Sequence, residues 1–171
     1  VEVHCKTDSG VGTKLVWTLR VGNLGFARAN TTTSFAPPQI LQLRGVGSTD
    51  APTRGGSRVD IMGSSFGPMG LAVPKARYRN QNSTAWYEAT GCVVSSHVLI
   101  VCNLAAGVGS AHRWEVVDVG GQDSALSLAE VTTSYAIPVI TALSGPGEAN
   151  AYTSGNQTLT ISGLNFGPKL G

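Results

Sequence analysis

The chain of 171 residues repeats part of itself at a spacing of about one hundred residues, and this limits what it can fold into. The segment 55–68 returns as 155–168, with Gly55, Ile61, Gly63, Phe66, Gly67 and Pro68 matching Gly155, Ile161, Gly163, Phe166, Gly167 and Pro168. A second match, offset by 97 residues, relates Cys5 and Trp17 to Cys102 and Trp114. Internal repeats of domain size indicate a tandem array of small units.

The repeated segment has the pattern of a strand followed by a turn. Val59 and Ile61 alternate with charged neighbours, which is typical of a strand with one buried face. Gly63 permits either a positive φ or the close approach of another strand. Phe66 can then fold back as an apolar plug before Gly67 and Pro68 turn the chain. The pattern therefore predicts a structural role and carries no chemistry.

The repeat divides the chain out of phase with its units. Residues 1–36 correspond to the C-terminal half of a unit, 37–137 to a complete unit, and 138–171 to the N-terminal half of the next. If the two halves were joined, the positions equivalent to 72–97 would be absent. A half-unit is too small to bury a sandwich core, so we expect both ends to need further protein beside them. Val1 is not an initiator Met, and we expect a processed product or a segment of a longer polypeptide; the sequence leaves open which.

The complete unit is predicted to contain only strands. Short β-like runs alternate with clusters of Gly, Ser, Asn and Pro, and no amphipathic helix is present. The expected strands cover residues 39–43, 58–62, 76–79, 85–89, 92–94, 98–102, 113–119 and a long last strand 125–134. The offset changes from 97 to 100 between Trp114 and Thr133, which predicts a hairpin three residues longer around 120–123.

The same residues carry a family resemblance. Gly-Gly-x-x-Val-x-Ile-x-Gly-x-x-Phe-Gly-Pro, beginning at Gly55, resembles the opening of an IPT/TIG domain. Pro38-x-Ile40 and Pro138-x-Ile140 are similar to the first strand of that family. IPT/TIG domains have an immunoglobulin-like fold and occur in plexins, some transcription factors and many cell-surface proteins. The resemblance implies an all-β protein of tandem immunoglobulin-like β-sandwiches, one complete unit flanked by two partial ones.

Three cysteines bear on the cellular compartment. A hairpin around Ser95-Ser96-His97 would bring Cys92 and Cys102 near enough for a disulfide, although two reduced, buried cysteines would also fit. Plexin-like members of the family carry a similar bridge, which favours the disulfide. Cys5 is the repeat equivalent of Cys102, and we expect its partner to lie outside this segment, upstream or in a neighbouring subunit.

Three N-glycosylation sequons also bear on the cellular compartment. Asn30, Asn82 and Asn156 each begin an Asn-x-Ser/Thr triplet, a pattern that a Thr-rich chain also produces by chance. Sequons in turns or at strand edges would project attached glycans into solvent. Together with a disulfide, they predict an extracellular or cell-surface location.

The sequence contains no recognisable catalytic or metal-binding pattern. Its three histidines are scattered, and His112 lies two residues before Trp114, so we expect a core or rim position for it. No acidic cluster suits calcium, and we expect no catalytic residue, metal or cofactor. Trp86 and Tyr87 lie beside the Asn82 sequon and are candidates for a sugar or subunit contact, with strand packing as the alternative.

Composition excludes two classes of partner. Twelve basic and ten acidic residues give a net charge of +2 without a dense basic patch, so we expect no nucleic-acid partner. No run of about 18 apolar residues exists, and we expect no direct membrane insertion.

These observations predict a non-enzymatic extracellular structural protein. In it, tandem units would form a filament, stalk or adhesive surface fibre by head-to-tail completion of split units between subunits. The partners would then be copies of the chain, or adjacent repeats of a longer chain. The alternatives are the spacer ectodomain of a plexin-like receptor and an accessory module of a secreted carbohydrate-active enzyme.

Overall fold

A computed structural model describes residues 2–70 and 74–168, and in these ranges it contains β-strands and no helix. Val1 and residues 169–171, the outermost positions of the two expected half-units, lie outside the described ranges. The strands are β1 (Leu15–Arg20), β2 (Phe26–Thr33), β3 (Gln39–Arg44), β4 (Arg58–Ser64), β5 (Lys75–Asn80), β6 (Tyr87–Glu88), β7 (Thr90–Ser96), β8 (Leu99–Asn103), β9 (His112–Val117), β10 (Thr132–Thr133), β11 (Val139–Ser144) and β12 (Thr160–Leu164).

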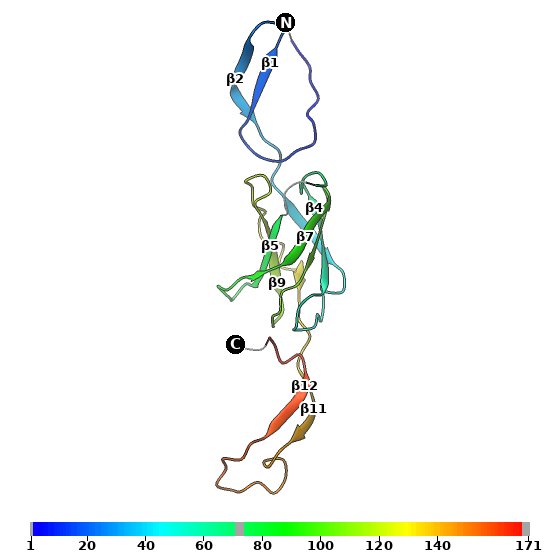
Figure 1. The fold of residues 1–171 in the computed structure, drawn as a ribbon, viewed down its shortest axis with the longest axis vertical. Coiled ribbons are helices and arrows are strands. Elements are labelled where there is room, and N and C mark those ends of the chain that lie inside the picture. Colours follow the sequence, from blue (N-terminus) through cyan, green and yellow to red (C-terminus); the bar gives the residue numbers. More distant parts are fainter. Residues whose placement is uncertain (1, 71–73, 169–171) are drawn as a thin grey trace.

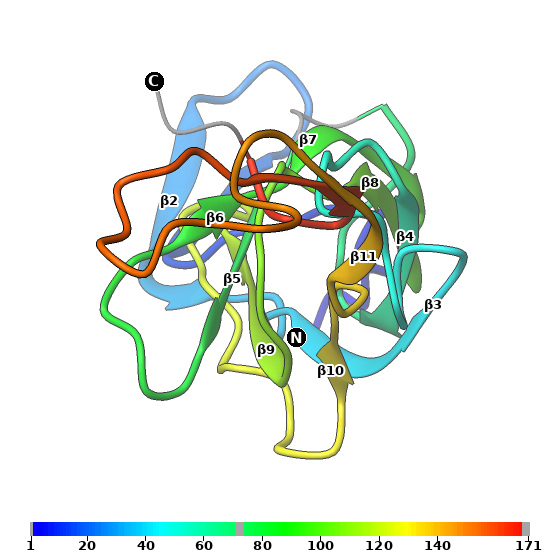
Figure 2. The ribbon, with the colours of Figure 1, turned by 90° about the horizontal axis from the view of Figure 1, so that it is seen from below.

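The strands form three groups along one axis. Figure 1 shows hairpin β1–β2 at one end, hairpin β11–β12 at the other, and the remaining strands between them. The central group consists of two four-stranded antiparallel sheets, in the orders β3-β4-β8-β7 and β10-β9-β5-β6. Seen along the axis in Figure 2, β5 and β9 lie on one side of the centre and β3, β4 and β8 on the other. The all-β prediction is confirmed, and this arrangement is consistent with a β-sandwich.

The core of the central group lies between its two sheets. Val59 and Ile61 of β4 and Ile100 of β8 are completely buried on one side. Tyr78 of β5 and Trp114 of β9 are completely buried on the other, with their rings stacked at 4.4 Å between centroids. The period-two pattern of β4 therefore places its apolar residues on the core face, as the sequence predicted.

The strand, glycine and aromatic plug form one local unit. Gly63 lies against the backbone of Gln39 in β3, and a Cβ there would also come within 2.6 Å of the Phe66 ring. Phe66 is buried, and its N–H donates to the His97 carbonyl at 3.0 Å. Of the two roles open to Gly63, close approach is therefore the one the structure uses, because the neighbouring strand and the plug occupy the space of a side chain.

The predicted last strand is wrong over most of its length. Only Thr132–Thr133 forms a strand, whereas Ser124 and Ser127 pair with β9 through both their N–H groups and their hydroxyls. Ser127 Oγ, for example, accepts from Trp114 N at 3.0 Å and donates to the Val131 carbonyl at 2.6 Å. Serine hydroxyls compete in this way with the regular backbone ladder, so the segment follows β9 without continuing as a strand.

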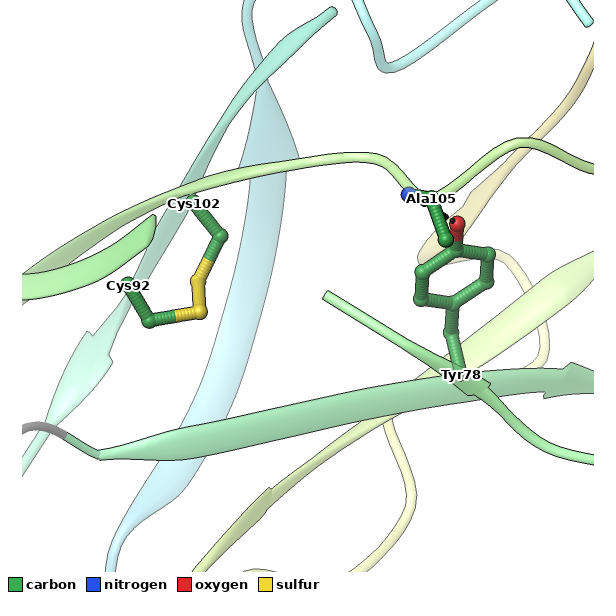
Figure 3. The surroundings of a disulfide bond; sticks show 4 residues. All are labelled: Tyr78, Cys92, Cys102 and Ala105. Carbon is green, nitrogen blue, oxygen red and sulfur yellow. Dashed lines mark hydrogen bonds between the residues drawn. A yellow bond between two sulfur atoms is a disulfide. The ribbon is translucent and has the colours of Figure 1, made fainter. Parts of the chain in front are cut away.

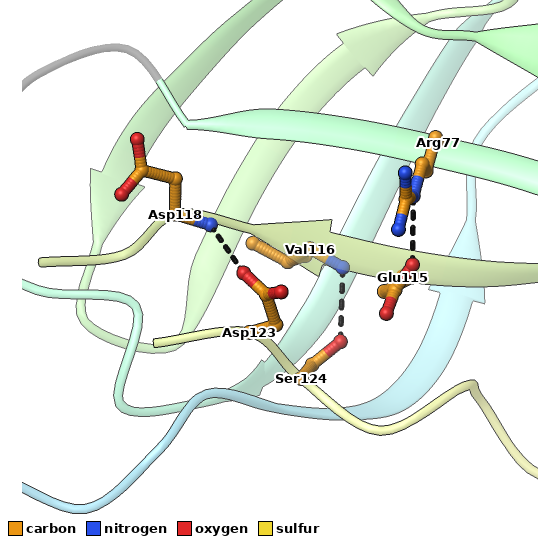
Figure 4. A network of polar contacts seen from close by, with 6 residues as sticks. All are labelled: Arg77, Glu115, Val116, Asp118, Asp123 and Ser124. Atoms are coloured by element: carbon orange, nitrogen blue, oxygen red, sulfur yellow. Dashed lines mark hydrogen bonds and ion pairs between the residues drawn. The ribbon is translucent and has the colours of Figure 1, made fainter. Parts of the chain in front are cut away.

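The chain turns back on β9 at residues 120–123, where the longer hairpin was predicted, but no regular strand follows the turn before Thr132. β9 ends at Val117, and the Asp123 carboxylate accepts from Asp118 N at 2.8 Å across the turn (Figure 4). Val119 N also donates to the Gln122 carbonyl at 2.8 Å. The Asp123 carboxylate therefore stabilises the turn that follows β9.

Candidate functional site

The ionisable residues of the described ranges do not converge on one place. No group of three or more His, Cys, Asp or Glu side chains suited to a metal ion occurs there. His112 is buried, with its Nδ1 3.3 Å from the Thr133 carbonyl, so the predicted core position is confirmed. Burial lowers the pKa of His112 below its ordinary value, and the backbone contacts at Thr133 and Val108 oppose this shift. His4, by contrast, is exposed beside Glu2.

A buried hydrogen-bonded ring joins the two sheets near the disulfide. The hydroxyls of Tyr78 and Tyr135 are 2.6 Å apart, Ala105 N donates to the Tyr78 hydroxyl at 3.0 Å, and Tyr135 donates to the Ala105 carbonyl at 2.7 Å. Burial raises the pKa of Tyr78, and the hydrogen bond with Tyr135 adds to the effect. Figure 3 places Tyr78 and Ala105 close to the Cys92–Cys102 bridge. The ring satisfies polar groups in the core and so stabilises the fold.

Cys92 and Cys102 are joined by a disulfide between β7 and β8, as predicted. Both cysteines are buried, whereas Cys5 is a free, exposed thiol. The partner expected for Cys5 outside this segment stays a prediction.

The three sequons are accessible. The side chains of Asn30 in β2, Asn82 between β5 and β6, and Asn156 between β11 and β12 are all exposed. Their glycosylation stays a prediction that this geometry permits.

Trp86 and Tyr87 differ in their surroundings. The guanidinium carbons of Arg77 and Arg79 lie 4.3 and 4.6 Å from the centre of the Trp86 ring, so this ring already contacts protein. Arg77 also pairs with Glu115 at 2.7 Å (Figure 4). Tyr87 stacks on Tyr78 at 5.3 Å between centroids and packs against the core. The pair is thus partly engaged within the unit, and a role in an outside contact stays a prediction.

The first of two unusual surfaces lies on hairpin β1–β2, which copies β9–β10 of the central group. Leu15 pairs with Thr33 and Val16 with Thr32, as His112 pairs with Thr133 and Arg113 with Thr132. The Trp17 indole N–H donates to Thr33 Oγ1 at 2.9 Å, and the same bond from Trp114 to Thr133 measures 3.0 Å. The sequence repeat therefore extends to the strand register and to a side-chain hydrogen bond.

The second surface lies on hairpin β11–β12, which copies β3–β4. Ile140 pairs with Gly163 and Leu143 with Ile161, the same register as their equivalents one hundred residues earlier, with a register shift at the same place. Gly163 also lies against the backbone of Val139 and the ring of Phe166, as Gly63 does against Gln39 and Phe66. The glycine and plug thus fold in the same way without the rest of a unit around them.

These two hairpins expose the residues that the central group buries. Trp17 is 41% exposed and Phe166 is 52% exposed, whereas Trp114 and Phe66 are 0% and 1% exposed. We call Leu15, Trp17 and Leu19 the N-terminal face, because their equivalents His112, Trp114 and Val116 are all buried. We call Ile140, Leu159, Ile161 and Phe166 the C-terminal face, because their equivalents Ile40, Val59, Ile61 and Phe66 are all buried.

The C-terminal face is concave. Pro138, Ile140, Ile161 and Phe166 line an open hollow of about 400 Å³. Folded proteins rarely leave contiguous apolar surface uncovered, and such surface is a candidate for contact with further protein or a ligand. The two faces are therefore the candidate functional sites of the chain, and the repeat in the sequence is the signal that locates them.

The chain was also compared with known proteins. No protein-family model, curated protein or solved structure matches it. The resemblance to IPT/TIG domains therefore rests on the segment 55–68, on Pro38-x-Ile40 and on their repeats. Among the residues that the structure describes, none belongs to a helix long and apolar enough to cross a bilayer.

Proposed function

We propose that the chain is a non-enzymatic structural protein of the cell surface or extracellular space, built from tandem immunoglobulin-like units of the IPT/TIG kind. It would serve as part of a stalk, filament or adhesive fibre. The observation that carries this proposal is the copied register of the two end hairpins. Each hairpin repeats one strand pair of the central unit, and each exposes a face that the central unit buries.

The connections between units support an extended shape. Residues 34–38 lead from β2 directly into β3, and residues 134–138 lead from β10 directly into β11, without a long linker. The Gln122 side chain donates to the Phe35 carbonyl at 3.3 Å, which ties the first connection to the central unit. Short, bonded connections favour a fixed angle between successive units, which suits a spacer or fibre.

The disulfide and the exposed sequons support the proposed location. A disulfide between two buried cysteines persists in oxidising compartments, and all three sequon asparagines are accessible to glycan transfer. These features are equally compatible with a spacer ectodomain of a plexin-like receptor. An accessory module of a secreted carbohydrate-active enzyme is less favoured, because Arg77 and Arg79 already contact the Trp86 ring, the candidate for a sugar contact.

Two measurements test the proposal. The chain secreted from a eukaryotic host should lose mass on N-glycosidase treatment, and an Asn82→Gln variant should lose one glycan fewer. X-ray scattering should give a radius of gyration well above the roughly 16 Å of a compact chain of this length. A chain that scatters as a compact particle, with its hairpins folded onto the central unit, would contradict the proposal.

A further inference from the structure

Within residues 2–70 and 74–168, hairpin β11–β12 lacks the third strand that its counterpart β3–β4 has in the central unit. In the central unit β4 lies between β3 and β8, and its pairing with β8 sets Val59 opposite Cys102 and Ile61 opposite Ile100. At the C-terminal end, β12 pairs with β11, and no third strand follows within the described residues. The outer edge of β12 therefore offers backbone groups that a further strand can bond.

The same chain holds a segment equivalent to β8. Residues 2–6 correspond to 99–103 by the offset of 97, so Val3 is the equivalent of Ile100 and Cys5 the equivalent of Cys102. Residues 2–6 are exposed and belong to no strand in the part of the chain that the structure describes. The chain therefore carries both the open edge of β12 and residues 2–6. The repeat equivalent of residues 2–6 is β8, which pairs with the corresponding edge of β4 in the central unit.

We infer that residues 2–6 of one copy pair antiparallel with β12 of a second copy, which deepens the proposed function and rests on it. The register copied from the central unit sets Cys5 opposite Leu159, and Val3 opposite Ile161. Val3 and Cys5 then face inward with the C-terminal face, while His4 faces solvent. Addition of a strand to an open edge is a common mode of recognition, with specificity from alternate side chains.

A second contact follows from the same equivalence. In the central unit Ala51 N donates to the Ser134 carbonyl at 3.0 Å, and Ala136 N donates to the Ala51 carbonyl at 2.8 Å. The equivalents are Ala151 in one copy and Ser34 and Ala36 in the other. This bond pair sets the N-terminal face of one copy against the C-terminal face of the next, as the equivalent residues share one core in the central unit.

The N-terminal end and β12 of one molecule lie at opposite ends of the structure (Figure 1), so the partner we infer is a second copy. The hairpins lie at opposite ends of the long axis (Figure 1), so the contact joins the head of one copy to the tail of another and repeats without closing. The joined unit contains β11, β12 and residues 2–6 on one side and β1 and β2 on the other. It lacks counterparts of β5 to β7, so we expect association that depends on concentration rather than a permanent complex.

Cys5 provides a direct test of the register. In a Leu159→Cys variant the introduced thiol would face Cys5 of the neighbouring copy, at the Cα separation that a disulfide needs. With oxidised glutathione as the oxidant, we expect a ladder of covalent oligomers on non-reducing gels, at least about tenfold more abundant than in a Ser162→Cys control. Position 162 lies three residues further along, in β12, opposite Glu2 and on the other face. Mass spectrometry of the ladder should identify the bond between positions 5 and 159.

A second pair of variants tests association without a covalent bond. Sedimentation velocity under reducing conditions should show the average mass of the unmodified chain rising with concentration. Ile161→Asp should weaken this association at least about tenfold, because it places a charge opposite Val3. Thr160→Asp, one residue away on the outward side, should leave it unchanged. Both variants should keep the melting temperature of the central unit, since neither residue belongs to its core.

The outcomes separate this inference from the proposed function. Equal ladders from Leu159→Cys and Ser162→Cys, or a chain that stays monomeric at every concentration, would overturn the pairing. An elongated, glycosylated monomer would overturn only the pairing, whereas a compact, unglycosylated chain would also overturn the proposed function.

Discussion

Replacement of Phe66 by alanine should destabilise the central unit strongly. The ring is 1% exposed and lies against Gly63, so its removal leaves a cavity in the core. Removal of a buried phenylalanine ring costs about 3–5 kcal/mol, against a total stability of roughly 5–15 kcal/mol for a domain. At about 4–8 °C per kcal/mol for a unit of this size, the melting temperature should fall by more than about 10 °C.

Phe166→Ala is the matched control. The two phenylalanines occupy the same place in the repeat and contact an equivalent glycine, but Phe166 is 52% exposed. Its removal should change the free energy of unfolding of the central unit by no more than about 0.5 kcal/mol.

Urea unfolding followed by tryptophan fluorescence measures both variants, because Trp114 is completely buried and reports on the core. The experiment belongs at low protein concentration, where contacts between copies contribute little. Equal losses in the two variants would refute the distinction between a buried and an exposed copy of the plug. A loss below about 1 kcal/mol for Phe66→Ala would refute its role in the core.

Three further predictions concern the central unit. Reduction of the Cys92–Cys102 bridge, which spans a sequence separation of 10, should lower the free energy of unfolding by about 2–3 kcal/mol in urea titrations with and without reductant. Thr133→Val should cost about 1–3 kcal/mol by leaving a buried indole N–H without its acceptor, while Thr33→Val, where the indole is partly exposed, should cost less than about 0.5 kcal/mol in the same titration. Because burial lowers the pKa of His112, the unfolded chain binds its proton at a higher pH than the folded chain, so stability should be constant above about pH 7 and fall below about pH 6.5, by up to about 1.4 kcal/mol per pH unit. His112→Leu should remove that slope in pH-dependent melting, and an unchanged slope would assign it to other groups.

The strand pattern of the repeat was predictable because two copies constrain each other. Alternation at Val59 and Ile61 and the coincidence of Gly63 with Gly163 located β4 and β12, and the paired registers agree with that prediction. The offset between Trp17 and Trp114 likewise relates β1 to β9, and both residues lie in strands.

Features that depend on side chains from distant segments were not predictable in the same way. Ser124 and Ser127 replace strand pairing with hydroxyl bonds, and a period-two pattern does not distinguish these two forms of attachment to β9. The ring of Tyr78, Tyr135 and Ala105 has no full counterpart in the repeat, because Phe35, the equivalent of Tyr135, lacks a hydroxyl.

The candidate sites followed from the sequence only in outline. The phase of the repeat predicted that residues 1–36 and 138–171 would expose apolar surface, but not which side chains would face outward. The register of β1 with β2 and of β11 with β12 supplies that detail. The contact of Trp86 with Arg77 and Arg79 required the pairing of β5 with β6, which spacing alone does not define.

The disulfide has a mechanical consequence. The chain enters the central unit at β3 and leaves it after β10 at the opposite end (Figure 1), so tension applied to the two ends would load the strands lengthwise and shear their hydrogen bonds. If the unit were pulled open, the Cys92–Cys102 bond would hold residues 93–101 in a closed loop that adds nothing to the stretched length. Reduction of that bond would add the loop to the length of chain that can be stretched. The oxidation state of Cys92 and Cys102 would therefore set the maximum extension of each unit.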